Sequence, residues 1–345
     1  MVLPGLSSIL ELQKGKELAK LFVRVTPTQV VYSIISTVSI HKVVDCRLNT
    51  KEEYFSLYVD PALKNIDDSF TAELSGDFIN FSNETTTVTL SAKREPYSTN
   101  DIFSGEKSEF TLNEQDIKIM SRCLSIIKQV ASKIHSDVHV QSFDGELSVG
   151  CAQMMTVARC FHDIPSFSMS VASFEVIMSA ILSHTAFLSG SDYSIKIVVY
   201  SKPSSYCFII DNDYIVEVHA KPFQNATSIA RPMEGECAIV SLDTDIKEYK
   251  FIDFTSDMES SELLCTDNLL SINLRSSKVR QNVTVAKIKN FNDAFRIRAS
   301  PIIIKQISRV LMDGMLLCRQ NNLLILSTPK GSLTYVIAGE FKDVL

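Results

Sequence analysis

The histidines and cysteines are the side chains of this chain best suited to catalysis or metal binding. The 345 residues include six histidines and eight cysteines, and both sets are scattered along the sequence. The closest cysteines are Cys151 and Cys160, so the short spacing of a zinc site or a thioredoxin-like redox motif is missing. His135 and His139 flank the expected start of a strand, and we do not expect them to share a metal. We therefore interpret the cysteines as reduced core residues of a cytosolic protein.

The common signatures of enzymes are also missing from the sequence. No GxSxG, GxxxxGK[ST] or GxGxxG pattern occurs. His162 and Asp163 are adjacent, but this dipeptide is more typical of a turn than of a catalytic dyad. The sequence therefore predicts no catalytic residue, no metal and no cofactor, although catalytic groups can converge from distant positions.

The elements that position the side chains are clearest at the C-terminal end. Residues 294–299 alternate as a short strand, and a helix follows from Pro301 to Leu311. Ser300 is a suitable N-cap, and proline is tolerated at the first helical position because that N–H has no helical partner. Three strand-like runs come next, separated by turn residues: 315–319, 323–328 and 333–339.

This unit of strand, helix and three strands recurs at intervals of roughly 45 to 65 residues. The helices are expected at about 6–21, after Asp60-Pro61, at 113–134, 173–187, 244–254 and 301–311. In the first copy a clear leading strand is missing. Polar segments near residues 95–108 and 221–235 interrupt the repeat and read as linkers. We therefore predict an α+β fold of six copies in three domains, at 1–97, 108–221 and 236–345.

The overall composition is that of a soluble globular protein. Hydrophobic residues make up 45% and charged residues 21% of the chain. No apolar run approaches the roughly 18 to 20 residues that span a membrane. The first residues lack a basic region followed by an apolar block, so we expect no secretory signal and a cytoplasmic location. The formal net charge of −6 argues against a wholly basic nucleic-acid binder. It does not exclude a protein that is acidic on one face and basic on another.

The repeat, the two linkers and the closing run Leu333-Thr-Tyr-Val-Ile-Ala-Gly-Glu-Phe-Lys-Asp-Val-Leu345 resemble the DNA polymerase sliding clamps. The three-domain form is similar to the bacterial β-clamp, and the chain resembles a divergent member such as a viral or phage one. The resemblance covers nearly the whole chain and is one of pattern rather than of signature residues. For a viral member the place of action would be the host cytoplasm or a replication compartment.

The resemblance implies that two chains close head to tail into a ring-shaped homodimer around double-stranded DNA. The helices would line the inner face and the antiparallel sheets would lie outside. Such a processivity factor binds DNA without sequence specificity, through weak contacts to phosphates. It tethers the replicative DNA polymerase, and both the polymerase and the clamp loader bind it through short peptide motifs.

The basic residues of the expected helices are the DNA-binding candidates that the resemblance implies. The first, third and sixth helices are predominantly basic, whereas the fourth carries only Glu175 and His184. The alternative is that these lysines belong to ordinary solvated helix faces. The candidates are Lys14, Lys16, Lys20, Lys118, Arg122, Lys128, Lys133, Lys247, Lys250, Lys305 and Arg309.

The family's peptide groove lies between the second and third domains and includes the C-terminal residues. Methionines suit such an adaptable surface, although they also serve as core fillers. The residues at the corresponding positions here are Met154, Met155, Pro232, Met233, Val344 and Leu345.

Two alternatives to a dimeric clamp stay open. One is a clamp with two domains per chain that closes as a trimer, which the chain length and the two linkers disfavour. The other is a clamp-like scaffold without ring closure that binds replication or transcription proteins.

Overall fold

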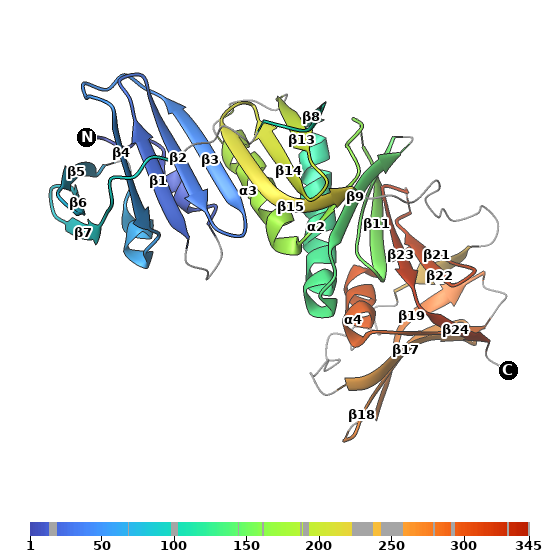
Figure 1. Cartoon of the computed structure of the whole chain (residues 1–345). Coiled ribbons are helices and arrows are strands. Elements are labelled where there is room, and N and C mark those ends of the chain that lie inside the picture. The colour runs from blue at the N-terminus through green and yellow to red at the C-terminus, as the bar shows by residue number, and fades with distance from the viewer. Residues whose placement is uncertain are drawn as a thin grey trace. The chain divides into compact units, whose positions relative to one another are not determined.

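In the computed structural model the chain divides into two compact units. Figure 1 shows the helices and strands of the chain. Unit 1 comprises Met1–Glu114 with Ala172–Pro222, and unit 2 comprises Gln115–Val171 with Phe223–Leu345. The predicted boundaries of three domains stay a prediction. The described residues are 1–13, 19–67, 69–97, 103–143, 145–160, 162–186, 188, 193–222, 237–242, 258–278, 280–290, 294–329 and 331–343.

Unit 1 is built on one antiparallel sheet in the order β4-β1-β2-β3-β15-β14-β13-β8. Side chains alternate along its strands: in β1, Leu21, Val23 and Val25 are buried, whereas Arg24 is exposed. The central contact joins β3 and β15, which are far apart in the sequence. The strands are β1 (Lys20–Val25), β2 (Gln29–Ile35), β3 (Ser39–Asp45), β4 (Glu53–Tyr58), β8 (Glu106–Asn113), β13 (Ser194–Ser201), β14 (Ser205–Ile210) and β15 (Tyr214–Pro222).

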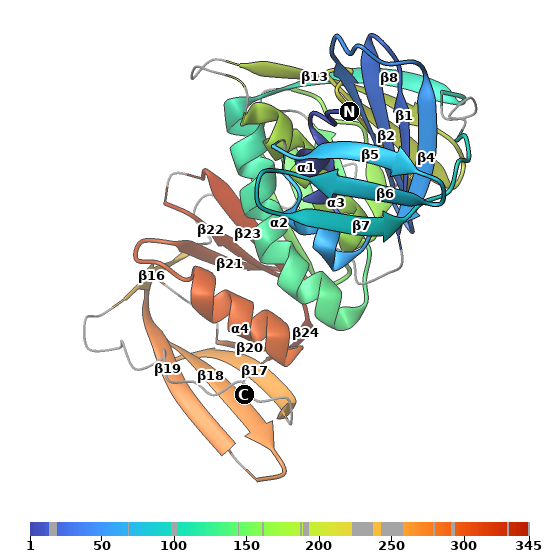
Figure 2. The ribbon, with the colours of Figure 1, turned by 90° about the vertical axis from the view of Figure 1, so that its left-hand side faces the viewer.

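Helices and a small second sheet complete unit 1. Helix α1 (Leu6–Leu10) packs on β2 and β3, and α3 (Val171–Thr185) reaches β15 through a contact of Ser183 with Tyr214. The short 3-10 helix η1 (Pro61–Asn65) begins as predicted, because the Asp60 carboxylate accepts a hydrogen bond from the Ala62 N–H at 2.8 Å. Figure 2 shows the separate sheet formed by β5 (Thr71–Ser75), β6 (Phe78–Ser82) and β7 (Thr87–Ser91).

Unit 2 is also built on a continuous antiparallel sheet, in the order β12-β9-β10-β11-β23-β22-β21-β16-β19-β18-β17-β20-β24. Its junction of β11 with β23 matches the junction of β3 with β15 in unit 1. The strands are β9 (Val138–Phe143), β10 (Glu146–Gly150), β11 (Met154–Arg159), β12 (Phe167–Met169), β16 (Ala238–Ser241), β17 (Met258–Thr266), β18 (Leu269–Ser276), β19 (Arg280–Lys289), β20 (Phe295–Ala299), β21 (Leu316–Gln320), β22 (Leu323–Ser327), β23 (Leu333–Ala338) and β24 (Glu340–Asp343).

Two helices of unit 2 adjoin, α2 (Glu114–Ile134) and α4 (Pro301–Val310). In α2, Ile117, Met120, Leu124 and Ile127 follow the helical repeat and are buried, which explains why this segment is an amphipathic helix. Helix α4 begins with Ser300 at the N-cap position and Pro301 inside the first turn, as predicted, although the Ser300 hydroxyl makes no capping hydrogen bond.

The leading strands are exchanged between the two copies of each predicted domain. Strand β8 precedes α2 but pairs with β13, and β12 precedes α3 but pairs with β9. In the C-terminal domain, β16 pairs with β21 and β20 pairs with β17. In the N-terminal domain, β4 pairs with β1. Each copy therefore adds its leading strand to the sheet of the other copy in the same domain.

The missing leading strand of the first copy is present in rudimentary form. Val2 forms a β-bridge with Thr71 at the start of β5, the position at which an exchanged leading strand would lie. The Ala72 N–H donates to the Met1 carbonyl at 2.7 Å, and the Met1 ammonium donates to the Ala72 carbonyl at 2.6 Å.

One predicted helix is wrong in its extent. The pattern predicts a helix over residues 6–21, but α1 ends at Leu10 and strand β1 begins at Lys20. Leu12 and Gln13 N–H groups bond to carbonyls three residues back, which tightens the end of the helix. Alternating burial from Leu21 to Val25, and pairing with β2 and β4, make the residues from Lys20 onward a strand. The helix predicted over residues 244–254 lies outside the described residues.

Candidate nucleic-acid and peptide interfaces

The predicted basic residues of the third helix share its solvent side. Lys118, Arg122, Lys128 and Lys133 are all exposed on α2, opposite the buried apolar residues. Because four cations stand along one amphipathic helix, the exposed side of α2 carries a positive stripe in a chain whose net charge is −6. A stripe of this kind suits contacts with a phosphate backbone.

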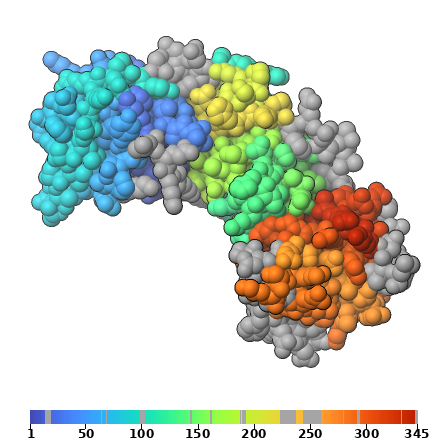
Figure 3. All heavy atoms as spheres, turned by 60° about the horizontal axis from the view of Figure 1, so that its bottom comes forward, coloured from blue at the N-terminus to red at the C-terminus, as the bar shows by residue number. Residues whose placement is uncertain are grey.

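Helix α4 extends this positive surface. The Gln306 side-chain amide donates to the Ile126 carbonyl at 3.0 Å, and the Arg309 guanidinium donates to the Gln129 side-chain oxygen at 2.7 Å. Figure 3 shows the green atoms of the α2 region against the orange-red atoms that follow β20. The structure therefore joins six predicted residues into what we name the α2–α4 basic face: Lys118, Arg122, Lys128, Lys133, Lys305 and Arg309.

The remaining DNA-binding candidates are not brought to that face. Lys20 lies on β1 rather than on a helix, and its ammonium group pairs with the Glu95 carboxylate. Because this lysine already has a counter-ion, it is not part of the proposed interface. Lys14, Lys16, Lys247 and Lys250 lie outside the described residues.

Helix α3 has no lysine or arginine that could extend a basic surface. Its His184 ring lies between two carboxylates of the β14–β15 turn, at 3.1 Å from both Asp211 and Asp213. The ring is therefore already paired with carboxylates of unit 1. This agrees with the sequence, in which the fourth helix is the one without lysine or arginine.

The groove candidates that the structure describes lie at the junction of β11 and β23. Met154 is buried and pairs with Ile337, and Met155 is half-buried and pairs with Val336. The two methionines therefore adjoin the segment that leads to the C-terminus, as the groove hypothesis requires. Pro232, Met233, Val344 and Leu345 fall outside the described residues.

A C-terminal strap, Gly339 with β24, was not predicted from the sequence. Strand β24 crosses to β20 and pairs with it, and the Phe341 ring lies 5.8 Å from the ring of Phe295 and 5.0 Å from the Arg319 guanidinium. A Cβ at Gly339 would stand 2.5 Å from Ile297, so only glycine fits this crossing. The alternation Glu340-Phe341-Lys342-Asp343 was a signal, but four residues are too few to separate a strand from a tail.

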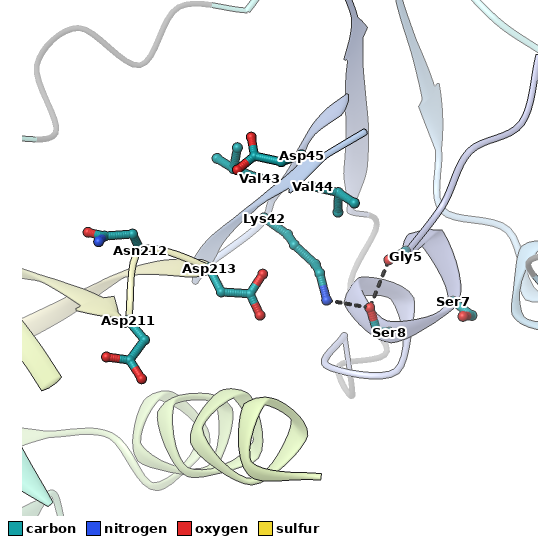
Figure 4. A pocket seen from close by; sticks show the side chains of 10 residues that line it. All are labelled: Gly5, Ser7, Ser8, Lys42, Val43, Val44, Asp45, Asp211, Asn212 and Asp213. Carbon is teal, nitrogen blue, oxygen red and sulfur yellow. Dashed lines mark hydrogen bonds between the residues drawn. The ribbon is translucent and has the colours of Figure 1, made fainter. Parts of the chain in front are cut away.

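A shallow pocket of about 520 Å³ lies between α1, β3 and the β14–β15 turn of unit 1 (Figure 4). The Lys42 ammonium is buried in its wall and donates hydrogen bonds to the Ser8 hydroxyl at 2.8 Å and to the Tyr214 hydroxyl at 2.7 Å. Its mouth is acidic, since it includes Asp45, Asp211 and Asp213. We interpret this network as a polar clasp between β3 and β15, because the ammonium joins side chains from both sides of that junction.

The histidines and cysteines show no activated nucleophile in the described part of the chain. His162 bonds to the buried Asp116 at 2.7 Å, not to Asp163, and Cys160 lies nearby. Burial, followed by the charges of Asp116 and Asp163, raises the pKa of the Cys160 thiol to about 11. A reactive cysteine requires a lowered pKa, so this trio does not form a catalytic triad.

His41 is buried, and its surroundings change the pKa of its ring strongly. Burial lowers its pKa to about 4, so the ring is neutral near pH 7. Its Nδ1 lies 2.8 Å from the Ser33 hydroxyl, and the Tyr97 ring stacks on it at 5.8 Å. Across the described ranges no group of three or more His, Cys, Asp or Glu side chains could hold a metal ion, and no helix there is long and apolar enough to cross a membrane.

Comparison with known proteins shows which solved structures share this architecture. No family model and no curated protein sequence matches the chain. Among solved structures, it is similar to the DNA polymerase sliding clamp of Caulobacter crescentus, with a TM-score of 0.69, 10% identity, and coverage of 97% of this chain and 98% of that one. The β subunit of DNA polymerase III from Thermotoga maritima gives 0.68 and 12%, covering 97% and 96%.

A third neighbour is the Helicobacter pylori β clamp bound to a DNA ligase peptide, with a TM-score of 0.62, 10% identity, and 97% of both chains covered. At identities this low the likeness concerns the fold, and it extends over almost the whole of each chain. The resemblance predicted from the sequence is therefore confirmed at the level of fold. The chain has the three-dimensional fold of the bacterial β sliding clamps.

Proposed function

We propose that the protein is a DNA sliding clamp that encircles duplex DNA and tethers a replicative polymerase as a processivity factor. The observation that carries the proposal is the α2–α4 basic face on a chain with the clamp fold and an acidic net charge. In this role the protein acts by binding and topology and not by catalysis. Its place of action would be the cytoplasm, or the replication compartment of a virus.

The α2–α4 basic face suits sliding better than sequence recognition. Lysine and arginine side chains that extend from two helices contact phosphates, which are alike at every base pair. Such contacts depend on salt because each of them releases counterions from the DNA. Contacts of this kind hold the duplex weakly and are alike along its length, so they allow movement along it.

A regularity in the strand pairing supports the proposal that the chain closes into a ring. The third strand of the first copy, β3, pairs with β15 of the fourth, and β11 of the third copy pairs with β23 of the sixth. The third strands that remain are β7 and β19. Within the described residues β7 pairs with β6 alone, and β19 meets β16 only at Lys287–Lys289. Pairing of β7 with β19 of a second copy would close a homodimer, and it would cover two exposed sheet edges.

The decisive experiment combines the mass of the particle with its behaviour on DNA. We expect a particle of two chains in solution that, once loaded, stays on nicked circular DNA and is lost when the circle is cut. A ring held by topology leaves a linear end freely, whereas an ordinary DNA-binding protein does not distinguish the two forms.

The other outcomes separate the alternatives. Three chains per particle would favour the trimeric clamp. One chain, with no difference between circular and linear DNA, would favour the scaffold without ring closure. Either result would contradict the dimeric clamp.

We further propose that the junction of β11 and β23 forms a groove for short peptide motifs of the polymerase and the clamp loader. Met155 supports this, since it is half-buried beside the end of β23, whereas Met154 at the same strand end is buried as a core residue would be. The groove would also include Pro232, Met233, Val344 and Leu345. Methionine side chains adapt to different apolar anchors, which a surface shared by several partners needs.

Removal of Val344 and Leu345 tests the groove. We expect the truncated chain to lose stimulation of its polymerase, because apolar anchors contribute most of the energy of such small interfaces. Assembly of the two-chain particle and retention on circular DNA should not change, since the expected ring contact uses β7 and β19. Full stimulation by the truncated chain would show that the groove lies elsewhere.

A further inference from the structure

A pocket of about 440 Å³ lies beside the first turns of α2 in unit 2, and we name it the α2 pocket. Its size falls within the range of small-molecule sites. Three elements build it, and its lining residues are Gln115, Ile119, Arg122 and Cys123 of α2, Ala158 and Arg159 of β11, and Ser332 with Leu333 at the start of β23.

The charge of its lining distinguishes the α2 pocket from three others in the described part of the chain. The α2 pocket contains two guanidinium groups and no carboxylate. Each of the others, all in unit 1, includes at least one acid: Asp45, Asp211 and Asp213 in the first, Glu52 and Glu95 in the second, and Glu11 in the third. Charge complementarity therefore selects an anionic ligand for the α2 pocket.

The two arginines are held differently. Tyr335 on β23 is 2% exposed; burial raises the pKa of its hydroxyl, and the Arg122 guanidinium, which hydrogen-bonds to it, acts in the opposite direction. Arg122 is thus positioned by a rigid neighbour. Arg159 ends β11 and is exposed, and its guanidinium makes no hydrogen bond or ion pair with the residues that the structure describes. One guanidinium is therefore pre-positioned and the other is available.

The rest of the lining is apolar or neutral. Ile119, Ala158 and Leu333 supply hydrocarbon surface, and burial raises the pKa of the Cys123 thiol to about 11, so it carries no negative charge near pH 7. The Gln115 amide and the Ser332 hydroxyl can hydrogen-bond to sugar or phosphate oxygens. The lining suits an anion that carries an apolar or planar group.

We propose that the α2 pocket binds a phosphate group, with Arg122 and Arg159 as its ligands and the attached nucleoside against Ile119 and Leu333. Guanidinium groups match phosphate oxygens because their N–H groups form a rigid fork. The phosphate has two possible sources, the backbone of DNA and a free nucleotide. The pocket itself does not depend on the proposed clamp function.

Titration of the full-length protein with deoxyadenosine 5′-monophosphate tests the site, with deoxyadenosine as the matched ligand that lacks the phosphate. We expect saturable binding of the monophosphate and at least tenfold weaker binding of the nucleoside. Arg159→Ala should weaken binding of the monophosphate at least tenfold, because charge-assisted hydrogen bonds to the phosphate are lost. Arg275→Ala, which removes an exposed arginine of β18, is the matched control and should leave binding unchanged.

A second arm identifies the source of the phosphate. If it is the DNA backbone, Arg159→Ala will also shorten retention on circular DNA and reduce the salt slope of binding by about one. If it is a free nucleotide, retention will not change while monophosphate binding is lost. Both results support the phosphate site, and neither requires that the ring encircles DNA. Monophosphate binding that does not saturate, or that is equal in Arg159→Ala, would overturn the proposal.

Discussion

Replacing Lys118, Arg122 and Lys128 together by glutamate is expected to reduce retention on circular DNA by at least about tenfold at physiological salt. All three side chains are exposed on α2. Loss of three phosphate contacts should lower the salt slope by about three, and the new carboxylates add repulsion. The protein should still fold, because exposed charges contribute little to stability and the Arg122 hydrogen bond to Tyr335 is a single contact. Retention at several salt concentrations, with thermal unfolding beside it, measures both effects.

A matched triple variant controls for net charge. Arg47 and Lys51 are exposed in the loop between β3 and β4, and Arg275 is exposed on β18. Their reversal changes the net charge by the same amount. We expect this control to retain DNA at close to the wild-type level. Equal losses in the two variants would mean that overall charge, and not the α2–α4 basic face, determines retention. Unchanged retention in the α2 variant would contradict the proposed interface directly.

Tyr214→Phe is expected to lower the free energy of unfolding by about 1.5–3 kcal/mol. The change keeps the ring, which lies 4.3 Å from the Lys42 ammonium, and removes the hydroxyl that accepts its hydrogen bond at 2.7 Å. The Ser183 hydroxyl, 3.0 Å from the same oxygen, loses a neighbour as well. Tyr214 is fully buried and Lys42 is nearly so, so the change leaves a buried ammonium with one acceptor fewer.

Urea unfolding of the two proteins measures this effect. Tyr54→Phe is the control, because Tyr54 is 43% exposed on β4 and its hydroxyl can bond to water. We expect the control to change stability by less than about 0.5 kcal/mol. A Tyr214→Phe protein as stable as the control would show that the polar clasp adds nothing to the junction.

Much of the fold could be predicted because the repeat produces patterns between residues that are close in the sequence. Helix α2 begins directly after Asn113 and ends at Ile134, as the sequence predicts, since one apolar stripe runs along its whole length. The Asp60 cap could also be predicted, because its hydrogen bond is to the N–H only two positions along the chain. Signals of this kind are short in range, and tertiary contacts agree with them.

Other features could not be predicted because they depend on contacts between distant residues. The local pattern shows that β8 precedes α2, but it does not show that β8 pairs with β13. The bridge of Val2 to Thr71 is a single residue pair, so it leaves no alternation in the sequence. Lys20 was assigned to a helix because an amphipathic helix was predicted to continue to residue 21, whereas pairing with two strands places it in a sheet.

The candidate interfaces divide in the same way. The basic residues of α2 and α4 could be chosen from composition, because cations on the polar side of an amphipathic helix are visible in the sequence. Arg159 could not, since it ends a strand and becomes notable only when β23 places Ser332 and Leu333 across from α2. Local patterns identify faces of single elements, and pockets arise where several elements meet.

The exchange of leading strands has a consequence for how the protein emerges from the ribosome. Glu106 of β8 bonds to Ser201 of β13, 95 positions later, so β8 must wait for its partner while the chain is being made. Neither copy of a domain can complete its sheet alone, which favours late, all-or-none assembly of the pair and slow folding. During synthesis the unpaired leading strands are the segments that a chaperone would need to shield from aggregation.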